Sequence, residues 1–274
     1  MITIQQALQR ARTQIDPLDA QALLCALLNV ERAYLLGHPD HPLAPEQAVQ
    51  FDAWVERCAA GEPLAYLLGR RAFYDRDFIV TSDVLIPRPE TELLVEHGLA
   101  FLRGRPGAAV VDVGTGSGAL AVTLAAHAPA AQVYAVDISP AALAVARQNA
   151  AQHRAVVNFL EGDLLLPFLE RRLRFDLLVA NLPYIVSGDL PSLAVTRWEP
   201  RLALDGGADG LDLVRRLLAQ APDAAGPGAR LLLEIGADQG AAAQALGAAA
   251  FPGASVTVLP DLAGHDRVLR LDLP

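Results

Sequence analysis

The sequence predicts a doubly wound α/β domain with a mostly parallel sheet, preceded by a small helical domain. Three observations support this prediction. Apolar strand-like runs alternate with helix-like segments from residue 108 onward. The first of these runs ends in a turn with three glycines, Gly114–Gly118, that leads into a helix. Residues 4–68, in contrast, carry a helical pattern of apolar positions.

Composition limits the class of protein. The 274 residues are 53% apolar and 19% charged, which is typical of a globular chain of one large or two smaller domains. The net charge of −9 argues against a broad nucleic-acid footprint.

Cys25 and Cys58 are isolated, which favours a reducing compartment. The first ten residues lack the order of a signal peptide, and no apolar stretch suits a membrane span, so we expect a cytoplasmic protein. The six histidines lack metal-ligand spacing, and we expect no metal site.

The first 70 residues are expected to form a bundle of four or five helices. Apolar residues at helical spacing mark one face of the first helix: Ala7, Leu8, Ala11 and Ile15. Asp16-Pro17 supplies a cap and a first-turn proline for a helix at 18–28. Further helices are expected at 31–36 and 45–60. Such a module either caps the main domain or holds a protein partner.

Residues 72–86 change to a strand-like pattern that predicts a β-hairpin turning at 81–83. Its first strand would include Phe73 and Phe78, and its second would be 84–86. The proline-stiffened stretch Pro87–Glu92 follows, and Thr91 or Glu90 could start a helix at 92–102. This stretch is either a linker or one wall of a ligand site.

The remaining chain alternates between the two kinds of element. Strands are expected at 109–113, 132–136, 156–160, 175–180, 229–235, 255–259 and 267–271. Helices are expected at 119–127, 140–152, 209–221 and 238–249. In such a sheet, ligands bind at the carboxyl ends of the strands.

The glycine turn predicts a nucleotide-cofactor site. Gly114, Gly116 and Gly118 permit positive φ angles and close approach of a ligand to the backbone. A strand that turns into a helix N-terminus also leaves backbone N–H groups unpaired. Asp137 ends the next strand, 23 positions after Gly114, where an acid commonly binds a ribose hydroxyl. These residues favour an adenosine-bearing cofactor and leave NAD and S-adenosylmethionine both open.

A second group of polar and aromatic residues, Asn181–Tyr184, follows the buried run 175–180 and should lie on the same rim. An amide or exocyclic amine nitrogen is a poor nucleophile, because its lone pair is delocalised. The Asn181 side-chain oxygen and a nearby backbone carbonyl could accept its two hydrogens, and the Tyr184 ring could stack beneath it. Positioning of this kind contributes most to a methyl transfer, which depends on in-line geometry.

Taken together, these motifs resemble the HemK/PrmC family, the S-adenosylmethionine-dependent methyltransferases of the glutamine in the GGQ motif of class-1 peptide release factors. The resemblance extends over nearly the whole sequence and includes Asp16–Leu24, Gly61–Tyr66, Leu85–Glu92, Val111–Gly118, Asn181–Tyr184, Glu199–Gly207 and Gly264–Val268. The stretch Ile86–Glu92 is more specific to this family than the glycine motif, which many methyltransferases share.

The resemblance implies a Rossmann-like methyltransferase fold with a seven-stranded, mostly parallel sheet. It implies a release-factor-binding helical bundle at 1–70, a β-hairpin linker at 71–90 and the methyltransferase domain at 91–274. The expected cofactor residues are Gly114, Thr115, Gly116, Ser117 and Gly118 at the methionine moiety, Asp137 at the ribose, Asp163 and Leu164 at the adenine, and Asn181. The expected product is S-adenosylhomocysteine, and the protein is expected to be a monomer.

By the same resemblance, Asn181, Leu182, Pro183 and Tyr184 receive the glutamine amide, and Asn181, Pro183 and Tyr184 are the expected catalytic residues. The usual family tetrapeptide is N-P-P-Y, and this chain has Leu182 at the second position. That position contributes its backbone carbonyl, which leucine retains. The form N-L-P-Y is also similar to that of ribosomal-RNA adenine dimethyltransferases.

Three alternatives remain at this point. An RNA or DNA adenine-N6 methyltransferase would use the same acceptor geometry on an adenine amino group, although the acidic balance argues against it. An NAD-dependent oxidoreductase would explain Gly114–Gly118 and Asp137 but would leave Asn181–Tyr184 without a role. A non-catalytic partner-binding module would bind no cofactor.

Overall fold

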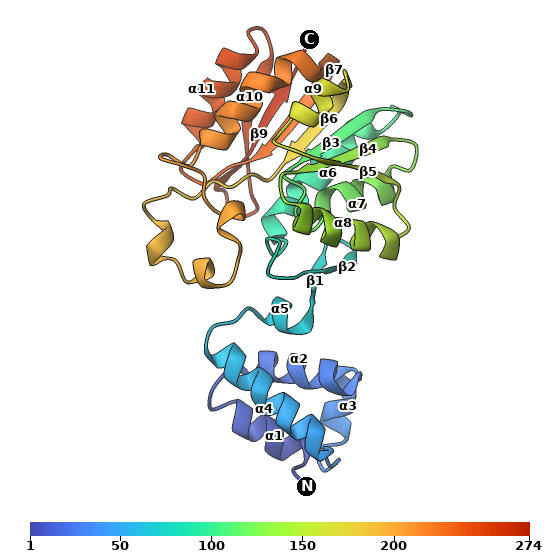
Figure 1. The fold of residues 1–274 in the computed structure, drawn as a ribbon, viewed down its shortest axis with the longest axis vertical. Helices are drawn as coiled ribbons and strands as arrows, with labels where there is room; N and C mark the ends of the chain where they lie inside the picture. The colour runs from blue at the N-terminus through green and yellow to red at the C-terminus, as the bar shows by residue number, and fades with distance from the viewer. The chain divides into compact units, whose positions relative to one another are not determined.

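The structure is a computed structural model that describes residues 1–274. The chain divides into two compact units, Met1–Arg70 and Arg71–Pro274 (Figure 1). Each unit has its own buried apolar core, so each is described by itself. No helix in the chain combines the length and apolar content that crossing a bilayer requires.

The first unit contains five helices, within the predicted four or five, although no range was predicted for the last: α1 (Ile4–Ala11), α2 (Pro17–Leu28), α3 (Arg32–Gly37), α4 (Pro45–Ala59) and α5 (Leu64–Leu68). Asp16 caps α2 through its side chain, which accepts a hydrogen bond of 2.7 Å from the Leu18 N–H, and Pro17 occupies the first turn. The core of this unit includes Leu23, Leu24 and Phe51, all almost fully buried.

The predicted hairpin exists, but its position was wrong. Its strands are β1 (Arg70–Phe73) and β2 (Arg76–Ile79), and the chain turns at Tyr74-Asp75, where Tyr74 has a φ of 58°. Residues 84–86 form no strand. Instead, the Ile86 N–H is hydrogen-bonded to the buried Glu199 carboxylate, 3.0 Å away. Val84 and Ile86 are apolar because they are buried in a loop, which a strand-like pattern cannot distinguish from a strand.

The second unit is built on a seven-stranded sheet, as expected. Its strands are β3 (Ala109–Val113), β4 (Gln132–Asp137), β5 (Val157–Glu161), β6 (Phe175–Ala180), β7 (Ala225–Glu234), β8 (Ser255–Pro260) and β9 (Asp266–Asp272). Their spatial order is β5-β4-β3-β6-β7-β9-β8, and only β9 runs antiparallel to its neighbours. The order reverses direction between β3 and β6, where doubly wound sheets bind ligands.

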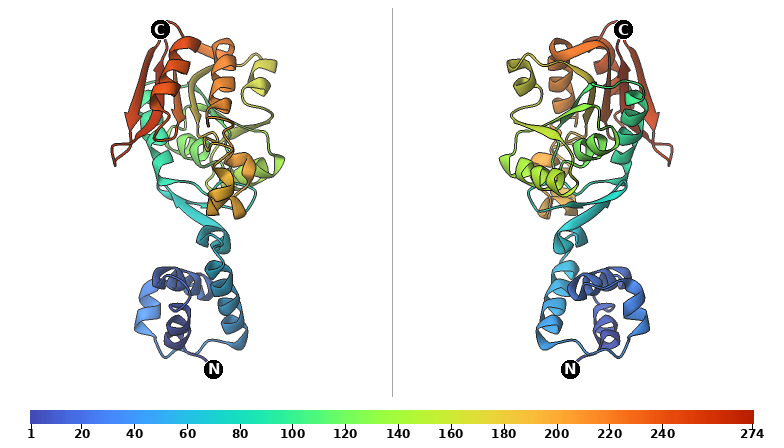
Figure 2. Two further views of the ribbon diagram at one scale, coloured as in Figure 1. Left: turned by 90° about the vertical axis from the view of Figure 1, so that its left-hand side faces the viewer. Right: turned by 90° about the vertical axis from the view of Figure 1, so that its right-hand side faces the viewer.

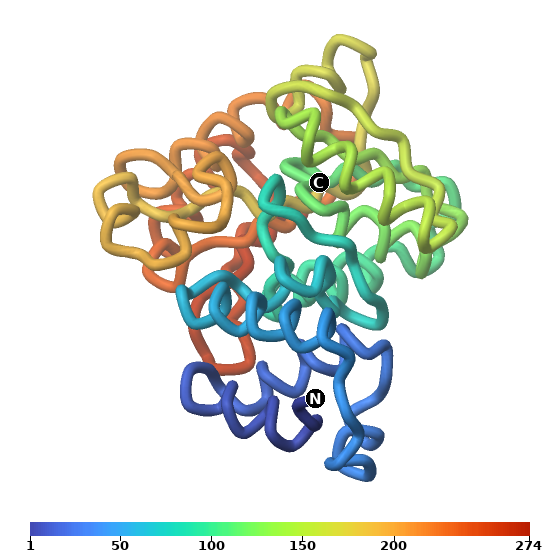
Figure 3. Tube along the Cα trace, turned by 60° about the horizontal axis from the view of Figure 1, so that its bottom comes forward, coloured from blue at the N-terminus to red at the C-terminus, as the bar shows by residue number.

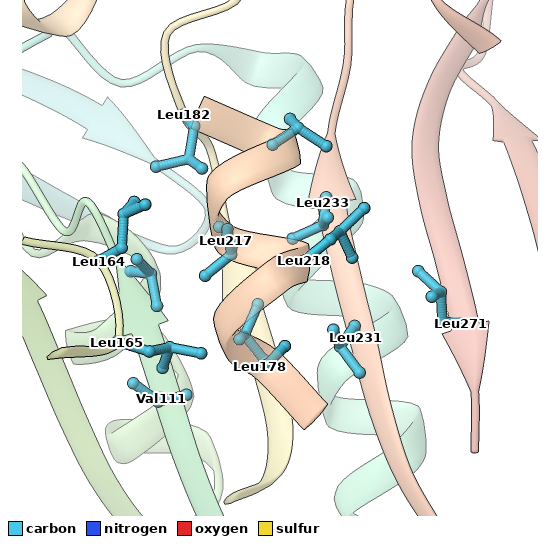
Figure 4. Packing of buried hydrophobic residues seen from close by; sticks show 14 of the residues in the cluster. Val111, Leu164, Leu165, Leu178, Leu182, Leu217, Leu218, Leu231, Leu233 and Leu271 are labelled. Carbon is cyan, nitrogen blue, oxygen red and sulfur yellow. The ribbon is translucent and has the colours of Figure 1, made fainter. Parts of the chain in front are cut away.

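Helices cover both faces of this sheet (Figures 1 and 2). One face packs against α6 (Glu92–Leu102), α7 (Ala119–His127) and α8 (Pro140–Gln152), and the other against α9 (Leu166–Glu170), α10 (Asp212–Ala224) and α11 (Gly240–Ala250). Successive residues of a strand point to opposite faces, so Leu177 joins the first core and Leu178 the second. Figure 4 shows Leu217 and Leu218 of α10 directed at the strands.

Two predicted boundaries were wrong. The helix expected at 209–221 begins only at Asp212, because the Asp209 carboxylate accepts the Leu211 N–H at 3.0 Å and holds a turn there. Strand β7 begins four residues before the predicted start, at Ala225. Between β6 and α10 the chain makes an excursion, residues 182–211, that contains short 3-10 turns at Leu190–Ser192, Ala194–Arg197 and Arg201–Ala203 (Figure 3).

Candidate active site

The glycine turn and the Asn181–Tyr184 corner meet at one edge of the sheet. Strands β3 and β6 are parallel neighbours, with Val113 opposite Ala180, so the residues that follow the two strands emerge side by side. A Cβ built on Gly114 would lie 3.0 Å from Leu182 Cδ2 and 4.0 Å from the Asn181 carbonyl oxygen. Gly114 also has a φ of 74°, so this position needs glycine for two reasons.

The two segments line a single cavity of about 240 Å³. The sequence-predicted residues that line it are Gly114, Thr115, Gly116, Ser117, Asp137, Asp163, Leu164, Asn181, Leu182 and Pro183. Gly118 and Tyr184 are not among its lining residues. Pro87, Arg88 and Thr91 also line the cavity, so the proline-stiffened stretch forms a wall of the site.

Gly118 shapes the site from outside the cavity. It is the residue before α7 and has a φ of 82°. An added Cβ would lie 3.1 Å from the Cβ of Ala146 on α8. The glycine therefore lets α7 begin at the turn while α8 packs closely against it.

Four of the N–H groups of the turn are paired within the protein, whereas those of Ser117, Ala119 and Leu120 have no acceptor, as expected where a strand turns into a helix N-terminus. Those of Gly114 and Thr115 donate to the Val136 carbonyl at 2.8 and 3.0 Å. The Gly116 N–H donates to the Asp137 carboxylate at 2.8 Å, and the Gly118 N–H to the Thr115 carbonyl, also at 2.8 Å. The first three donors attach the turn to the end of β4, and the fourth closes the turn on itself. The unpaired N–H groups at the start of α7 remain available to a ligand.

Two carboxylates set the electrostatics of the turn. Asp112 is 1% exposed and accepts from the Thr115 hydroxyl at 2.6 Å and the Ala121 N–H at 3.1 Å. Burial raises the pKa of Asp112 to about 7. Burial also raises the pKa of Asp137, although the N–H groups of Ser139 and Gly116 oppose the shift. Both carboxyl groups line the cavity, so a ligand bound at the turn would lie beside them.

Asp163 and Leu164, the residues expected at the adenine, are joined by Arg216, which the sequence did not indicate. The Asp163 carboxylate forms an ion pair with Arg216 of α10, which also lines the cavity. Leu164 adopts a φ of 51°, unusual for a residue with a Cβ, and is buried. Arg216 is 53 residues from Asp163 in the chain, so no local motif connects the two.

The later part of the excursion, together with Gln239, holds the Pro183-Tyr184 corner in place. The Ile185 N–H donates to the Leu204 carbonyl at 3.1 Å, and Gln239 Nε2 donates to the Tyr184 carbonyl at 3.0 Å. A Cβ on Gly206 would lie 2.8 Å from the Pro183 carbonyl oxygen, so the excursion can pack here only with glycine. Burial raises the pKa of the Tyr184 phenol, which therefore stays neutral.

Glu199 ties the excursion to the proline-stiffened stretch. This side chain is 4% exposed, accepts the Ile86 N–H and pairs with the Arg88 guanidinium. Pro200, Leu202 and Ala203, which follow Glu199 in the chain, line the same cavity. Sequence reasoning missed these residues as site components, although Glu199–Gly207 stood out as a shared motif.

Thr91 has a different role from the expected one. Its position precedes α6, but its side chain makes no capping hydrogen bond. The Thr91 hydroxyl instead donates to the Glu234 carboxylate at 2.6 Å and accepts from Asn181 Nδ2 at 2.9 Å. Glu234 lies at the end of β7, and burial raises its pKa to about 7.

The fold and this cavity define a methyltransferase of the S-adenosylmethionine-dependent class. A family model described as a methyltransferase domain matches residues 110–199, and the PrmC N-terminal domain model matches residues 2–69. A solved 16S rRNA methyltransferase of T. thermophilus, in complex with AdoMet and guanosine, shares the fold with a TM-score of 0.55. Its identity is 19%, and the alignment covers 75% of this chain and 50% of that one.

Two curated relatives identify the family. The chain is 49% identical to the release factor glutamine methyltransferase of Moorella thermoacetica over 91% of this chain and 89% of the relative. It is 47% identical to that of Xylella fastidiosa (strain Temecula1), over 95% and 94% respectively. The chain therefore belongs to the release factor glutamine methyltransferase family, and the resemblance drawn from its motifs is confirmed.

Proposed function

We propose that this protein transfers the methyl group of S-adenosylmethionine to the side-chain amide nitrogen (N5) of the glutamine in the GGQ motif of class-1 release factors. The products are the N-methylated amide, S-adenosylhomocysteine and a proton. One observation carries the proposal: Gly114–Ser117 of the glycine turn and Asn181–Pro183 of the corner line the same cavity. Family membership supports the choice of a glutamine amide over an adenine amino group.

The residues of the turn fit the cofactor. A Cβ built on Gly116 meets no heavy atom within 4 Å, so a side chain there would project into open space that a ligand can use. Gly114–Ser117 would hold the methionine moiety, Asp137 the ribose, and Asp163 with Leu164 the adenine. When bound, S-adenosylmethionine supplies a methyl group on a positively charged sulfur, which is a good leaving group.

The corner would hold the substrate amide. Asn181 Oδ1 and the Leu182 carbonyl would accept the two amide hydrogens. Tyr184 follows the lining residue Pro183 without itself lining the cavity, and its ring would support the amide plane. Two acceptors on the hydrogens favour a more tetrahedral nitrogen, whose lone pair is available for attack. Fixed orientation converts an encounter between two molecules into a reaction within one complex, which lowers the barrier substantially.

Leu182 replaces the usual proline without removing the proposed acceptor, because every residue has a backbone carbonyl. Its side chain is 4% exposed and belongs to the apolar core on the α10 face of the sheet. The Leu182 side chain also lies against the glycine turn, since a Cβ built on Gly114 would be 3.0 Å from Leu182 Cδ2. We infer that packing of Leu182 supplies part of the rigidity that proline supplies in relatives with N-P-P-Y.

We further propose that residues 1–70 bind the release factor and that residues 71–274 are the catalytic unit, in which the expected linker 71–90 also supplies Pro87 and Arg88 to the wall of the cavity. The first unit has a core of its own and contributes no residue to the lining of the cavity, which supports a role in recognition. We expect the protein to act as a cytoplasmic monomer without a nucleic-acid partner.

The direct test incubates the protein with methyl-labelled S-adenosylmethionine and a release factor, either with an intact GGQ motif or with its glutamine replaced. We expect label only in the intact factor. Equal labelling of both factors would reject the assignment. Label transferred to ribosomal RNA but to neither factor would instead establish the adenine methyltransferase.

A further inference from the structure

Three side chains from distant parts of the chain form a continuous hydrogen-bonded row that begins at the wall of the cavity. Asn181 Nδ2 donates to Thr91 Oγ1 at 2.9 Å, and Thr91 Oγ1 donates to Glu234 Oε2 at 2.6 Å. Asn181 and Thr91 both line the cavity, although Thr91 is only 5% exposed, whereas Glu234 is 1% exposed and does not line it. The row therefore leads from a proposed catalytic residue into the protein interior.

The chemistry of the row gives it a direction. A carboxylate can only accept, so an ionised Glu234 requires Thr91 to use its single hydroxyl proton as donor toward Glu234. Thr91 can then only accept from its other neighbour, and only the NH₂ end of the Asn181 carboxamide donates. The Oδ1 end is thereby left for a ligand.

We propose that Thr91 and Glu234 are positioning residues that set the orientation of the Asn181 carboxamide and so present Oδ1 as the acceptor for the substrate amide. This inference rests on the function proposed above. Neither residue is assigned contact with substrate; each acts through Asn181. If the carboxamide were turned over, its NH₂ end would face the hydrogens of the substrate amide, and the acceptor would be lost.

The row is sensitive to protonation of Glu234. Burial raises the pKa of this carboxyl to about 7; the charges of Arg267 and Arg88 lower it, and that of Glu90 raises it further. The Tyr184 phenol, which also interacts with Glu234, stays neutral because burial raises its pKa. A protonated Glu234 can donate to Thr91, which frees the Thr91 proton for Asn181 Oδ1 and allows the turned-over orientation. Turnover should therefore fall as the pH drops through about 7.

The test compares Thr91→Val, Thr91→Ser and Glu234→Gln with the wild-type protein on a release factor with an intact GGQ motif. Thr91→Val should lower kcat about tenfold, the effect of one lost hydrogen bond of about 1.4 kcal/mol. KM and the affinity for S-adenosylhomocysteine, measured by calorimetry, should change little. Thr91→Ser should recover most of kcat, because it restores the hydroxyl.

Glu234→Gln tests the pH dependence of kcat, which would not change if Glu234 had only a structural role. A glutamine cannot titrate and can either donate to or accept from Thr91. At pH 8, kcat of Glu234→Gln should therefore be a few-fold lower than that of wild type. The decrease in kcat at acid pH (the acid limb), which the wild type should show between pH 8 and pH 6, should be absent from the variant. Thr123→Val is the matched control: Thr123 is fully buried in α7, and its hydroxyl has no hydrogen-bond partner. It should leave kcat and the pH profile unchanged.

Wild-type kcat in Thr91→Val, or an unchanged acid limb in Glu234→Gln, would overturn the proposal. If Thr91→Val fails to bind S-adenosylhomocysteine, and so has lost its fold, the pH profiles of wild type and Glu234→Gln decide. A wild-type protein that labels no release factor overturns the proposed function instead. The same variants are then compared on whichever nucleic acid it methylates, so the two failures are distinguishable.

Discussion

The carboxamide of Asn181 has two chemically different ends, and its surroundings decide which end faces the cavity. The Asn181 side chain follows β6, where the chain leaves the sheet, and its NH₂ end is bound to Thr91. A single hydrogen bond therefore determines which end of the Asn181 carboxamide is available to a ligand. This bond can be removed by one substitution without disturbing the sheet behind it.

Asn181→Ala should lose about 100-fold in kcat, because the proposed acceptor and the orientation it provides both disappear. Binding of S-adenosylhomocysteine, followed by calorimetry, should stay within a few-fold of wild type. Asn158→Ala is the matched control, since Asn158 is exposed on β5 and lies outside the cavity. Unchanged turnover in Asn181→Ala would remove Asn181 from the mechanism.

Asp112 should make folding stability depend on pH. Burial raises its pKa from 3.8 to about 7, so between these values the folded protein holds a proton that the unfolded chain has released. The free energy of unfolding should therefore fall as pH rises through this window, by about 1.4 kcal/mol per pH unit. Asp112→Asn cannot titrate, while its side-chain oxygen can still accept from Thr115.

The measurement is urea denaturation of ligand-free wild type and Asp112→Asn at pH 5 and pH 8. The wild type should lose stability relative to the variant between the two values. Glu234, which also has a raised pKa, is present in both proteins, so its contribution cancels. A difference that is the same at both pH values would show that Asp112 ionises normally in the folded state.

At the scale of elements, the turn between β3 and α7 combines a backbone requirement with a packing requirement. Gly118 has a positive φ, and an added Cβ would also crowd Ala146 on α8. Gly104 has a similar φ of 73°, but an added Cβ there would meet nothing within 4 Å. Alanine substitutions at Gly104 and Gly118 therefore separate two contributions to the free energy of unfolding: backbone strain, which both share, and side-chain crowding, which only Gly118 has.

Gly104→Ala should lower the free energy of unfolding by about 1–2 kcal/mol, the cost of a left-handed alanine. Gly118→Ala should lose about 1 kcal/mol or more beyond that, because α7 and α8 must also move apart. Denaturant titration of both variants gives the comparison. Equal losses would indicate that the contact between α7 and α8 yields freely.

At the scale of the whole molecule, the chain consists of two units, each with its own apolar core. The cavity is lined entirely by residues between Asp83 and Arg216, which all belong to the second unit. Cofactor binding and release-factor recognition can therefore be assigned to different parts of the chain and tested separately.

A protein consisting of residues 71–274 should bind S-adenosylhomocysteine with unchanged affinity. Its KM for a full-length release factor should rise about tenfold or more, equivalent to about 1.4 kcal/mol of lost binding free energy. Its activity on a short peptide containing GGQ should match that of the full chain. A KM for the full-length factor equal to that of the intact protein would reject the recognition role of residues 1–70.

The sequence by itself determined the α/β architecture, the seven strands and the placement of Gly114–Gly118 and Asn181–Tyr184 on one rim. Apolar periodicity and glycine position report directly on how a local segment folds, and parallel strands bring their carboxyl ends to a common edge. The predicted position of the hairpin was wrong because residues 84–86 are apolar, with Val84 and Ile86 buried, yet lie in a loop. Periodicity does not distinguish that case from a strand.

Only the tertiary structure decided which polar groups are partners. Thr91 and Glu234 are 143 residues apart, and Asp163 and Arg216 are 53 apart, so no local pattern connects either pair. The pairing of the Gly116 N–H with Asp137 likewise required the end of β4 to lie beside the turn. Hydrogen bonds depend on distances between atoms, and distances between remote segments exist only once the chain has folded.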